Sequence, residues 1–337
     1  MGSASLWRSP RACRLVLALL LAAATPARAN SPLTTIVHPG ARQTFQGFGA
    51  SFVESPGPYG RISQADRDAL ARLVWHDCRF RILRLWFSPP AFAPHPGERN
   101  TTEFLRDYVT SGMTADAQRA GATTLLLAPN QVPAYLGKGD VITSQGITDY
   151  ASLLADFLRK VKDENGITFA ASGVLNEPHD GHPIIQANQW AEMVRAFRKA
   201  LDERGLQSVA IIAPEHASGG DAYCMQSLES IHRDPEAWRA LGGAASHSYN
   251  MGVTERMAAL VGDKPFWMTE ASANGPEEPD DALAGASLAA RVLNDLNHRA
   301  THWIHFIAYH LADPADDQVC ATHFFKSLIC AVFCCVV

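Results

Sequence analysis

The hydrophobic and polar residues of this chain alternate between short apolar runs and longer amphipathic segments. In the segment 149–161, the leucines, Phe157 and Val161 recur at the spacing of one face of an α-helix, and 190–201 repeats that pattern. Short apolar runs bounded by turn residues are instead typical of buried strands. Eight such runs follow one another along the chain: Phe45–Phe52, Arg81–Ser88, Thr123–Ala128, Phe169–Leu175, Val209–Ala213, Ala244–Tyr249, Phe266–Thr269 and Trp303–Tyr309.

The alternation of these runs with helical segments predicts an α/β fold of the (β/α)8 TIM-barrel type. Parallel strands need crossover connections, which helices usually supply, and a barrel of this type typically occupies about 250 residues. A doubly wound open sheet is the alternative, but the glycines of 47–49 lack the third glycine and the helix start of a dinucleotide-binding loop. We therefore predict that residues 45–314 form a barrel.

Residues 1–29 have the pattern of a secretory signal peptide. Arginines precede the apolar stretch Leu15–Ala24, and Ala27 and Ala29 flank Arg28 in a small-x-small cleavage site. We therefore expect an extracellular protein. The sequon at Asn100 then predicts a glycoprotein.

The segments on either side of the predicted barrel differ from it in pattern. Residues 30–44 include one further apolar run, Leu33–Val37, which predicts a strand outside the barrel. Residues 315–337 form an atypical Cys-rich tail, and we interpret it as an abnormal chain end caused by truncation or an altered reading frame. Its last ten residues are apolar but too few to cross a bilayer, so no stable membrane insertion is expected.

The charge balance argues against a nucleic-acid partner, and the cysteine content leaves one disulfide open. Lys and Arg total 29 against 34 for Asp and Glu, and no basic stripe suggests a nucleic acid. Two cysteines, Cys78 and Cys224, lie within the predicted barrel, and they could form a disulfide or remain free.

Two glutamates stand at the carboxyl ends of apolar runs. Glu177 follows the run Phe169–Leu175, and Glu270 follows Phe266–Thr269. Because the carboxyl ends of barrel strands converge on one face, both side chains are expected at the same mouth. One glutamate as acid/base and one as nucleophile is the requirement of a retaining glycosidase, with the two carboxyl groups about 5–5.5 Å apart. A glutamate before proline is also common at the start of a helix, which is the alternative interpretation of Glu177.

Other polar residues near the ends of these runs could serve that pair. Arg84 is a charged residue in an apolar strand and needs an anionic partner, for which Glu270 is the candidate; a purely structural ion pair is the alternative. His247 and Tyr249 lie two residues apart and should face the same side, although Tyr249 could instead be a core aromatic. The remaining candidates are Asn176, which could donate to a sugar 2-hydroxyl, and Tyr135 and Trp303, which could stack on a sugar.

Competing chemistries have weaker support in the sequence. Glu215 ends the fifth run, but the residues 216–220 after it have the composition of a flexible loop, so we rank it third among the carboxylates. The histidines, including His179 and His182, form no His-Glu-x-x-His pattern, and no CxxC pair supports zinc. No Gly-x-Ser-x-Gly elbow indicates a serine hydrolase. We expect no metal and no cofactor.

The ordered series of motifs resembles glycoside hydrolase family 30, a family of retaining (β/α)8-barrel glycosidases. The resemblance covers about Leu33 to Pro314 and departs from the family at Asn130, where members often carry tryptophan, and in the last strand, where Phe306 or Tyr309 replaces one. The resemblance implies Glu177 as acid/base and Glu270 as nucleophile, supported by Arg84, Asn176 and Tyr249. It also places Asn130 among the substrate-binding residues. The motifs that carry it are Gln46–Phe52, Arg84, Pro129–Leu136, Asn176–Pro178, His247-x-Tyr249 and Thr269-Glu270.

The resemblance also implies a β-sandwich beside the barrel, of which only the strand at 30–44 is expected here. A strand without its sheet exposes an edge and an apolar face, so we expect a compromised scaffold. The leading hypothesis is a secreted retaining endo- or exo-β-glycosidase acting on a β-linked glycan: a galactan, a glucan, a xylan or a glucosyl lipid. The alternative is a catalytically inactive or carbohydrate-binding truncated protein.

Overall fold

The computed structural model describes residues 40, 43–52, 59–179, 183–249, 252–272 and 281–308, without the side chains of 281–284. The chain divides into two units, residues 1–41 and 42–337, and the fold below belongs to the second unit. The predicted signal peptide, the strand Leu33–Val37 and the tail at 315–337 lie outside the described residues, as do His182 and Tyr309.

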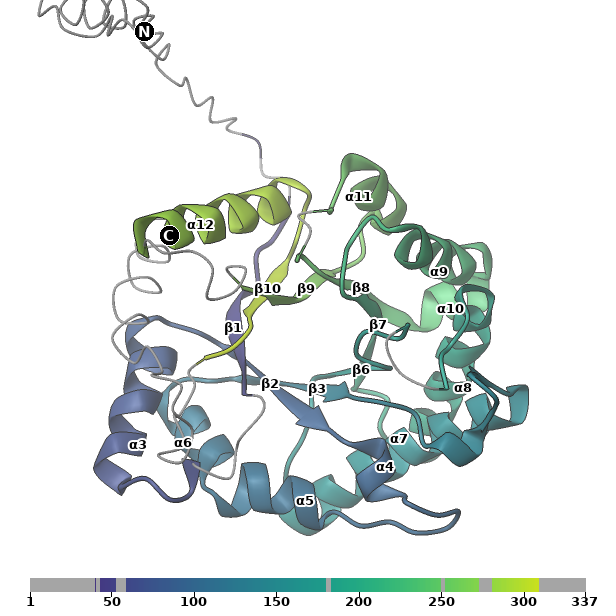
Figure 1. Cartoon of the computed structure of the whole chain (residues 1–337), viewed down its shortest axis with the longest axis horizontal. Helices are drawn as coiled ribbons and strands as arrows, with labels where there is room; N and C mark the ends of the chain where they lie inside the picture. The colour runs from purple at the N-terminus through teal and green to yellow at the C-terminus, as the bar shows by residue number, and fades with distance from the viewer. Residues whose placement is uncertain are drawn as a thin grey trace, which may run out of the picture. The chain divides into compact units, whose positions relative to one another are not determined.

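Eight parallel strands close into a barrel, which confirms the predicted fold class (Figure 1). The sheet closes because β1 pairs with β2 on one side and with β10 on the other. Seven of the predicted runs match their strands to within three residues at each end. The eighth run, Trp303–Tyr309, begins one residue after the start of its strand, and its predicted end lies outside the described residues. The barrel strands are β1 (Gly47–Phe52), β2 (Ile82–Phe87), β3 (Thr124–Pro129), β6 (Ala171–Gly173), β7 (Ala210–His216), β8 (Leu241–His247), β9 (Phe266–Ala271) and β10 (His302–His305).

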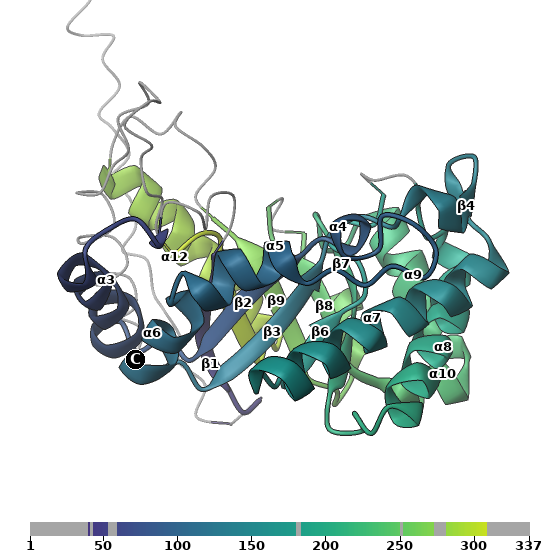
Figure 2. The same cartoon turned by 90° about the horizontal axis from the view of Figure 1, so that it is seen from below.

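Helices surround the barrel, and a short hairpin of β4 (Gly137–Lys138) and β5 (Val141–Ile142) follows β3 (Figures 1 and 2). Thr143 caps the longest helix by accepting a hydrogen bond from the Gly146 N–H, and Gly166 ends it in the left-handed conformation. The predicted segments 149–161 and 190–201 lie inside α7 and α8. The helices are α3 (Gln64–Ala71), α4 (Pro89–Phe92), α5 (Thr102–Phe104), α6 (Met113–Ala120), α7 (Ser144–Asn165), α8 (Trp190–Glu203), α9 (Ala222–Arg233), α10 (Pro235–Ala240), α11 (Glu255–Val261) and α12 (Asp281–Asn297).

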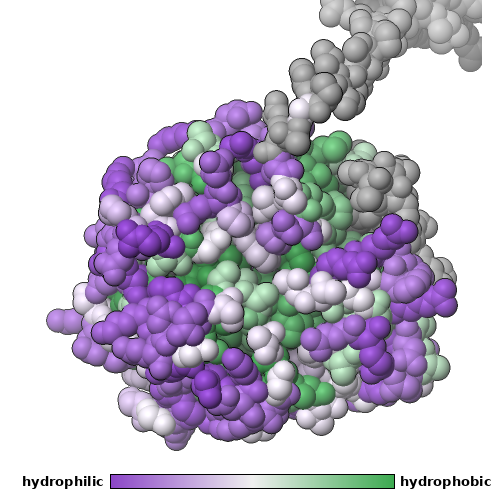
Figure 3. Space-filling model, turned by 180° about the vertical axis from the view of Figure 1, so that it is seen from behind, coloured by the Kyte–Doolittle hydropathy of each residue, from purple (hydrophilic) through white to green (hydrophobic). Residues whose placement is uncertain are grey.

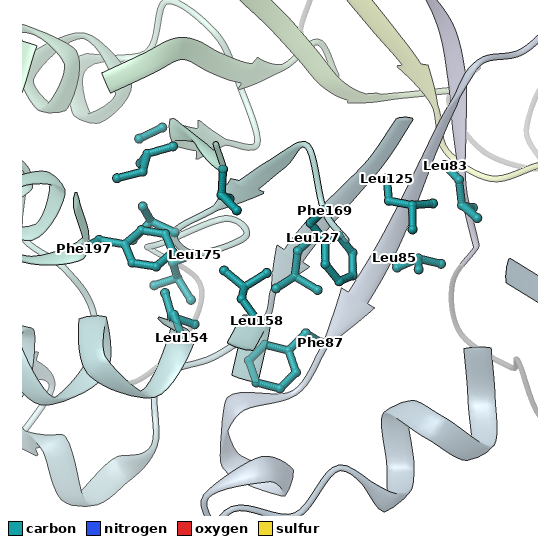
Figure 4. Packing of buried hydrophobic residues seen from close by; sticks show 14 of the residues in the cluster. Leu83, Leu85, Phe87, Leu125, Leu127, Leu154, Leu158, Phe169, Leu175 and Phe197 are labelled. Carbon is teal, nitrogen blue, oxygen red and sulfur yellow. The ribbon is translucent and has the colours of Figure 1, made fainter. Parts of the chain in front are cut away.

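The main hydrophobic core lies between the outer face of the sheet and the helices (Figure 4). Leu125 and Leu127 of β3 are buried in it together with Leu158 of α7. The Phe87 and Phe157 rings stack with centroids 3.7 Å apart, which joins the end of β2 to α7. This packing fixes the height of α7 against the strands and therefore the position of their carboxyl ends.

A second, smaller cluster fills the inside of the barrel. It takes one residue from each of seven strands: Ile82, Leu126, Ala171, Ile212, Ala245, Trp267 and Ile304. Because side chains alternate along a strand, residues two positions after these also face inward, closer to the mouth. Arg84 lies two residues after Ile82, and His247 lies two residues after Ala245, so the fold directs both into the barrel.

Glu270 reaches the same interior because β9 contains an irregularity. Ser246 of β8 pairs with Met268, but the next residue, His247, pairs with Glu270, so β9 carries one extra residue. A bulge of this kind breaks the alternation of side chains and turns a residue toward the opposite face. β7 contains a similar shift at Glu215, between Pro214 and His216.

The outer surfaces of the helices are polar. Pairs four residues apart on α7, such as Arg159 with Asp163 and Lys160 with Glu164, join opposite charges. Figure 3 shows hydrophilic residues around the edge of the face opposite to that of Figure 1, and hydrophobic residues toward its centre. None of the described helices combines the length and apolar character that crossing a membrane requires.

The two cysteines of the barrel are buried and do not form a disulfide with each other. The structure therefore does not contain the disulfide between Cys78 and Cys224 that the sequence left open. Cys224 is fully buried in α9, and burial raises the pKa of its thiol to about 12, so it stays protonated at neutral pH.

Candidate active site

Glu270 lies at the mouth of the barrel with two donors on its carboxylate. Arg84 donates from Nη1 to Oε2 over 2.7 Å, and the Tyr249 hydroxyl donates to Oε1 over 2.6 Å. The carboxylate is 5% exposed and the guanidinium is fully buried, so the ion pair is screened little by water. Charge-assisted bonds to both oxygens favour the ionised form and fix the direction of the carboxylate.

Asn176 holds the other end of the same guanidinium. Its Oδ1 accepts a hydrogen bond from Arg84 Nη2 over 2.6 Å, and its backbone N–H donates to the Pro129 carbonyl over 2.7 Å. The Asn176 side chain therefore joins the end of β6 to Arg84. This contact orients Arg84 toward Glu270.

Glu177 follows Asn176 in an unusual backbone conformation. Its φ angle is 45°, in the left-handed region, and its N–H donates to the Glu215 carbonyl over 3.1 Å. Its Oε1 lies 2.9 Å from His247 Nδ1, and its side chain is 24% exposed. A non-glycine residue in this region is uncommon and is retained where the surrounding structure enforces it. The strain places the Glu177 carboxylate at the mouth, facing His247.

The two glutamates face each other across His247. One ligand atom from each of Glu177, His247 and Glu270 lies within 4.8 Å of the others. Three such groups could also surround a metal ion, but the Arg84 guanidinium at 2.7 Å from Glu270 opposes a dication there by charge repulsion. The geometry therefore fits catalysis by the two carboxylates better than coordination of a metal ion.

The electrostatics of Glu177 do not favour the protonated form that a general acid needs. Burial raises the pKa of this carboxyl, but the hydrogen bond and charge of His247 lower it further, so the net pKa is below its ordinary value. A proton on His247 Nδ1 favours the carboxylate form of Glu177. With its proton on Nε2, His247 would instead accept a hydrogen bond from a protonated Glu177.

The surroundings of the second ring nitrogen, Nε2, affect which of these two tautomers His247 adopts. His247 is fully buried, and its Nε2 has no hydrogen-bond partner among the described residues. The nearest anionic atom to Nε2 is Oε2 of Glu270, 3.9 Å away. A proton on Nε2 would face this carboxylate oxygen, and that attraction favours the tautomer that allows Glu177 to carry a proton.

Three sequence-predicted residues lie outside this group of contacts. Tyr135 lies on the turn after β3, and its side chain is 39% exposed. Asn130 is half-buried at the end of β3 and lines a cavity of about 170 Å³ with Trp86. Trp303 is fully buried, so its position differs from the expected sugar platform.

Trp303 instead takes part in a buried polar network with α12. Its indole N–H donates to Asp295 Oδ2 over 2.9 Å, and the Ser248 hydroxyl donates to Oδ1 over 2.9 Å. Ser248 stands between His247 and Tyr249, so Asp295 fixes the end of β8 from outside the barrel. The sequence offered no signal for this role, because Asp295 is one polar residue within a helical segment.

Asp295 predicts a pH-dependent stability. Burial raises the pKa of this carboxyl from 3.8 to about 6, although the bonds from Trp303 and Ser248 lower it. Between these pH values the unfolded chain loses the proton and the folded protein keeps it, so stability falls as the pH rises. The unfolding free energy of wild type relative to Asp295→Asn should fall by roughly 2 kcal/mol from pH 4 to pH 7.

Urea unfolding followed by tryptophan fluorescence at each pH measures that difference. Ser248→Ala removes a bond that lowers the pKa of Asp295 and leaves the carboxyl in place, so its stability should fall with rising pH at least as steeply as that of wild type. A wild-type-minus-Asp295→Asn difference that is constant from pH 4 to pH 7 would contradict the buried, titrating carboxyl.

The structure adds two residues to the site. Glu215, which the sequence ranked third because a flexible loop was expected after it, lies within β7, fully buried and 3.5 Å from Arg84 Nη2. Only His216 of the expected loop belongs to β7, and the residues 217–220 form a turn after the strand. Two contacts hold this turn: Ser218 forms a bridge with Ser248, and the Gly219 N–H donates to the His247 carbonyl. Trp86 places its ring 5.3 Å from the Arg84 guanidinium.

Comparisons with known proteins place the fold. No protein-family model matches the chain, and no match is found among curated proteins. Among solved structures, an endo-β-1,6-glucanase aligns over 82% of this chain and 68% of its own at 20% identity, with a TM-score of 0.68. SrfJ from Salmonella typhimurium aligns over 78% of this chain and 65% of its own at 17% identity, with a TM-score of 0.66.

The catalytic domain of the glycoside hydrolase family 30 xylanase C from Talaromyces cellulolyticus is a third match. It aligns over 79% of this chain and 68% of its own at 18% identity, with a TM-score of 0.62. This chain spans about two thirds of the length of each of these proteins. At such identities the likeness shows a shared (β/α)8 fold, and the missing β-sandwich stays a prediction.

Proposed function

We propose that this protein is a retaining β-glycosidase in which Glu270 is the nucleophile and Glu177 the acid/base. The observation that carries the proposal is that an oxygen atom of one carboxylate lies within 4.8 Å of an oxygen atom of the other at one barrel mouth. This separation is close to the roughly 5–5.5 Å of retaining enzymes and well below the 6.5–9.5 Å of inverting ones. The fold shared with glycoside hydrolases adds support.

The two carboxylates have surroundings suited to different roles. Glu270 receives two charge-assisted hydrogen bonds and is held rigidly, as a nucleophile that attacks an anomeric carbon requires. Glu177 is more exposed and contacts a titratable imidazole, so it can exchange a proton with a leaving group and then with water. Glu270 forms the glycosyl ester while Glu177 protonates the departing oxygen; water deprotonated by Glu177 then releases the sugar on the same face.

The proposed substrate is an extracellular β-linked glycan. The candidates remain galactan, glucan, xylan and a glucosyl lipid, since Asn130 and the exposed Tyr135 suit hydrogen bonding and stacking to any of them. Secretion follows from the signal-peptide pattern at residues 1–29. We propose that no metal and no cofactor take part.

A mechanism-based labelling experiment tests this function. The purified chain would be incubated with 2-deoxy-2-fluoro β-glycosides of galactose, glucose and xylose, followed by peptide mass mapping. We expect a stable adduct on Glu270 with one of the sugars, and the same adduct in the surface variant Glu203→Gln. Folded protein that forms no adduct with any sugar, or an adduct on another residue, would overturn the assignment.

A carbohydrate-binding protein without hydrolytic activity is the second candidate. The observation that favours it is the lowered pKa of Glu177, because an ionised carboxylate cannot protonate a leaving group. Calorimetry with oligosaccharides separates the two. Binding without adduct formation and without product would support the binding function.

A further inference from the structure

A third carboxylate, Glu215, lies beneath the proposed catalytic pair. It is fully buried, and neither carboxylate oxygen has a hydrogen-bond partner among the described residues. The absence of a side chain at Gly173 makes room for it, since a Cβ there would overlap Glu215 Oε2. Glu215 also has a φ angle of 53°, so its backbone, like that of Glu177, is held in the left-handed region.

Glu215 contacts the supports of both proposed catalytic residues. Its Oε1 lies 3.5 Å from Nη2 of Arg84, whose Nη1 holds Glu270. Its carbonyl oxygen accepts the hydrogen bond from the Glu177 N–H over 3.1 Å. One residue of β7 therefore connects the guanidinium of the nucleophile with the backbone of the acid/base.

We propose that Glu215 is a positioning residue that carries a proton in the working enzyme, fixing Arg84 and the Glu177 backbone while leaving the guanidinium charge to Glu270. This inference rests on the proposed function for its catalytic meaning. The protonated state does not depend on that function and can be measured by itself.

The geometry favours the protonated form. Arg84 already donates to Glu270 and Asn176, and its distance of 3.5 Å to Glu215 is too long for a strong charge-assisted bond. A buried carboxylate without donors is costly, and the carboxyl escapes this cost by keeping its proton. Burial accordingly raises the pKa of Glu215. The charges of Arg84 and His247 and the nearby Thr269 hydroxyl offset only part of the rise.

The surroundings of Glu215 contain charged and titratable groups from several elements. Burial raises the pKa of the Tyr150 phenol on α7 well above its ordinary value, and the pKa of Tyr249 is raised as well, so both hydroxyls stay neutral. Burial lowers the pKa of the neighbouring His216, which favours its neutral form. The groups that face Glu215 or its contacts are Arg84 from β2, Tyr150 from α7, Glu177 after β6, His216 from β7, His247 and Tyr249 from β8 and its end, and Glu270 from β9.

Infrared difference spectroscopy tests the protonation without any substrate. Spectra of wild type and Glu215→Gln would be compared at pH 6, above the ordinary glutamate pKa of about 4.3. We expect the difference to contain the carbonyl band of a protonated carboxyl group, lost in the variant. A difference made of carboxylate bands instead would overturn the proposal, whether or not the protein hydrolyses glycans.

The positioning role is tested with variants of different shape and charge. Glu215→Gln keeps the shape and neutrality of a protonated glutamate, whereas Glu215→Met keeps only its length. We expect kcat/KM to fall on the order of 10²-fold in Glu215→Met and about tenfold or less in Glu215→Gln, since small displacements of catalytic groups have effects of this size. Circular dichroism and urea unfolding confirm that each variant is folded, and Glu203→Gln serves as the surface control.

The pH profile of kcat/KM distinguishes charge from shape. The limb that rises at low pH reports the group that must be ionised, and the limb that falls at high pH reports the group that must be protonated. With a neutral Glu215, both limbs stay in place in Glu215→Gln. If both move to lower pH, Glu215 is an anion in wild type, and if Glu215→Met retains wild-type kcat/KM, it does not position the pair; either result overturns the proposal.

The experiments also distinguish an error in the proposed function from an error in the assignment of Glu215. If wild type itself forms no adduct and no product, the kinetic comparison has no signal, while the infrared bands and the unfolding data still report the state of Glu215. A protonated Glu215 in a protein without activity would contradict the proposed function and leave the buried acid established.

Discussion

Glu270→Ala is expected to lose hydrolysis by on the order of 10⁴-fold or more in kcat/KM, because no other group can form the glycosyl ester. The loss should be accompanied by the disappearance of the fluoroglycoside adduct. Arg84 and Tyr249 would keep their places but have no carboxylate to hold, so the variant also leaves a buried guanidinium without its anion. We therefore expect a lower unfolding temperature together with the loss of activity.

Azide separates a lost nucleophile from a damaged fold. In Glu270→Ala a small anion can enter the vacated space and attack an activated aryl β-glycoside from the side of the missing carboxylate. The product expected by nuclear magnetic resonance is the α-glycosyl azide, with the configuration inverted. A folded Glu270→Ala that retains wild-type kcat/KM would remove Glu270 from the mechanism.

Glu177→Ala is expected to show an effect that depends on the leaving group. General acid catalysis contributes on the order of 10²–10⁴-fold, so kcat/KM for an unactivated oligosaccharide should fall by about that factor. An aryl glycoside whose phenol is acidic needs little protonation, so formation of its glycosyl ester should be almost unaffected. Water attack on the ester still requires the base, which lowers kcat and makes the ester accumulate.

The same variant has its own test with azide. Because Glu270 remains, azide attacks the glycosyl ester from the side of Glu177, and the expected product is the β-glycosyl azide. Equal losses for activated and unactivated substrates would show that Glu177 is not the acid. The opposite configurations of the two azide products assign the two glutamates independently of their pKa values.

The pairing of Arg84 with Glu270 shows what the sequence could predict about the site. A charged residue in an apolar strand must have a partner, and a glutamate at the end of another strand of the same barrel is the natural one. The contact of 2.7 Å is present in the structure. Asn176 and Tyr249 also reach the pair, because each follows or ends a strand whose carboxyl end lies at the mouth.

Glu215 and Trp303 show where reasoning from the sequence reached its limit. The fifth apolar run ends at Ala213, but β7 continues through Glu215 to His216 in an irregular pairing with β8, and the turn begins only after that residue. Trp303 is the second residue of β10, whose side chains face alternately inward and outward, and pairing in the closed barrel places it against Asp295 instead of the mouth. Strand register and bulges depend on the neighbouring strands, so a single run of residues does not reveal them.

The sequence by itself determined the alternation of strands and helices, hence the barrel, and the residues that follow its strands, hence the candidate carboxylates. Hydrophobic period and local turn residues carry that information within a dozen positions. Only the tertiary structure decided that a bulge turns Glu270 inward, that Glu177 contacts His247, and that Glu215 lies buried beneath both. These features arise from contacts between residues far apart in the chain, where closure of the barrel fixes distances and charges that no local pattern encodes.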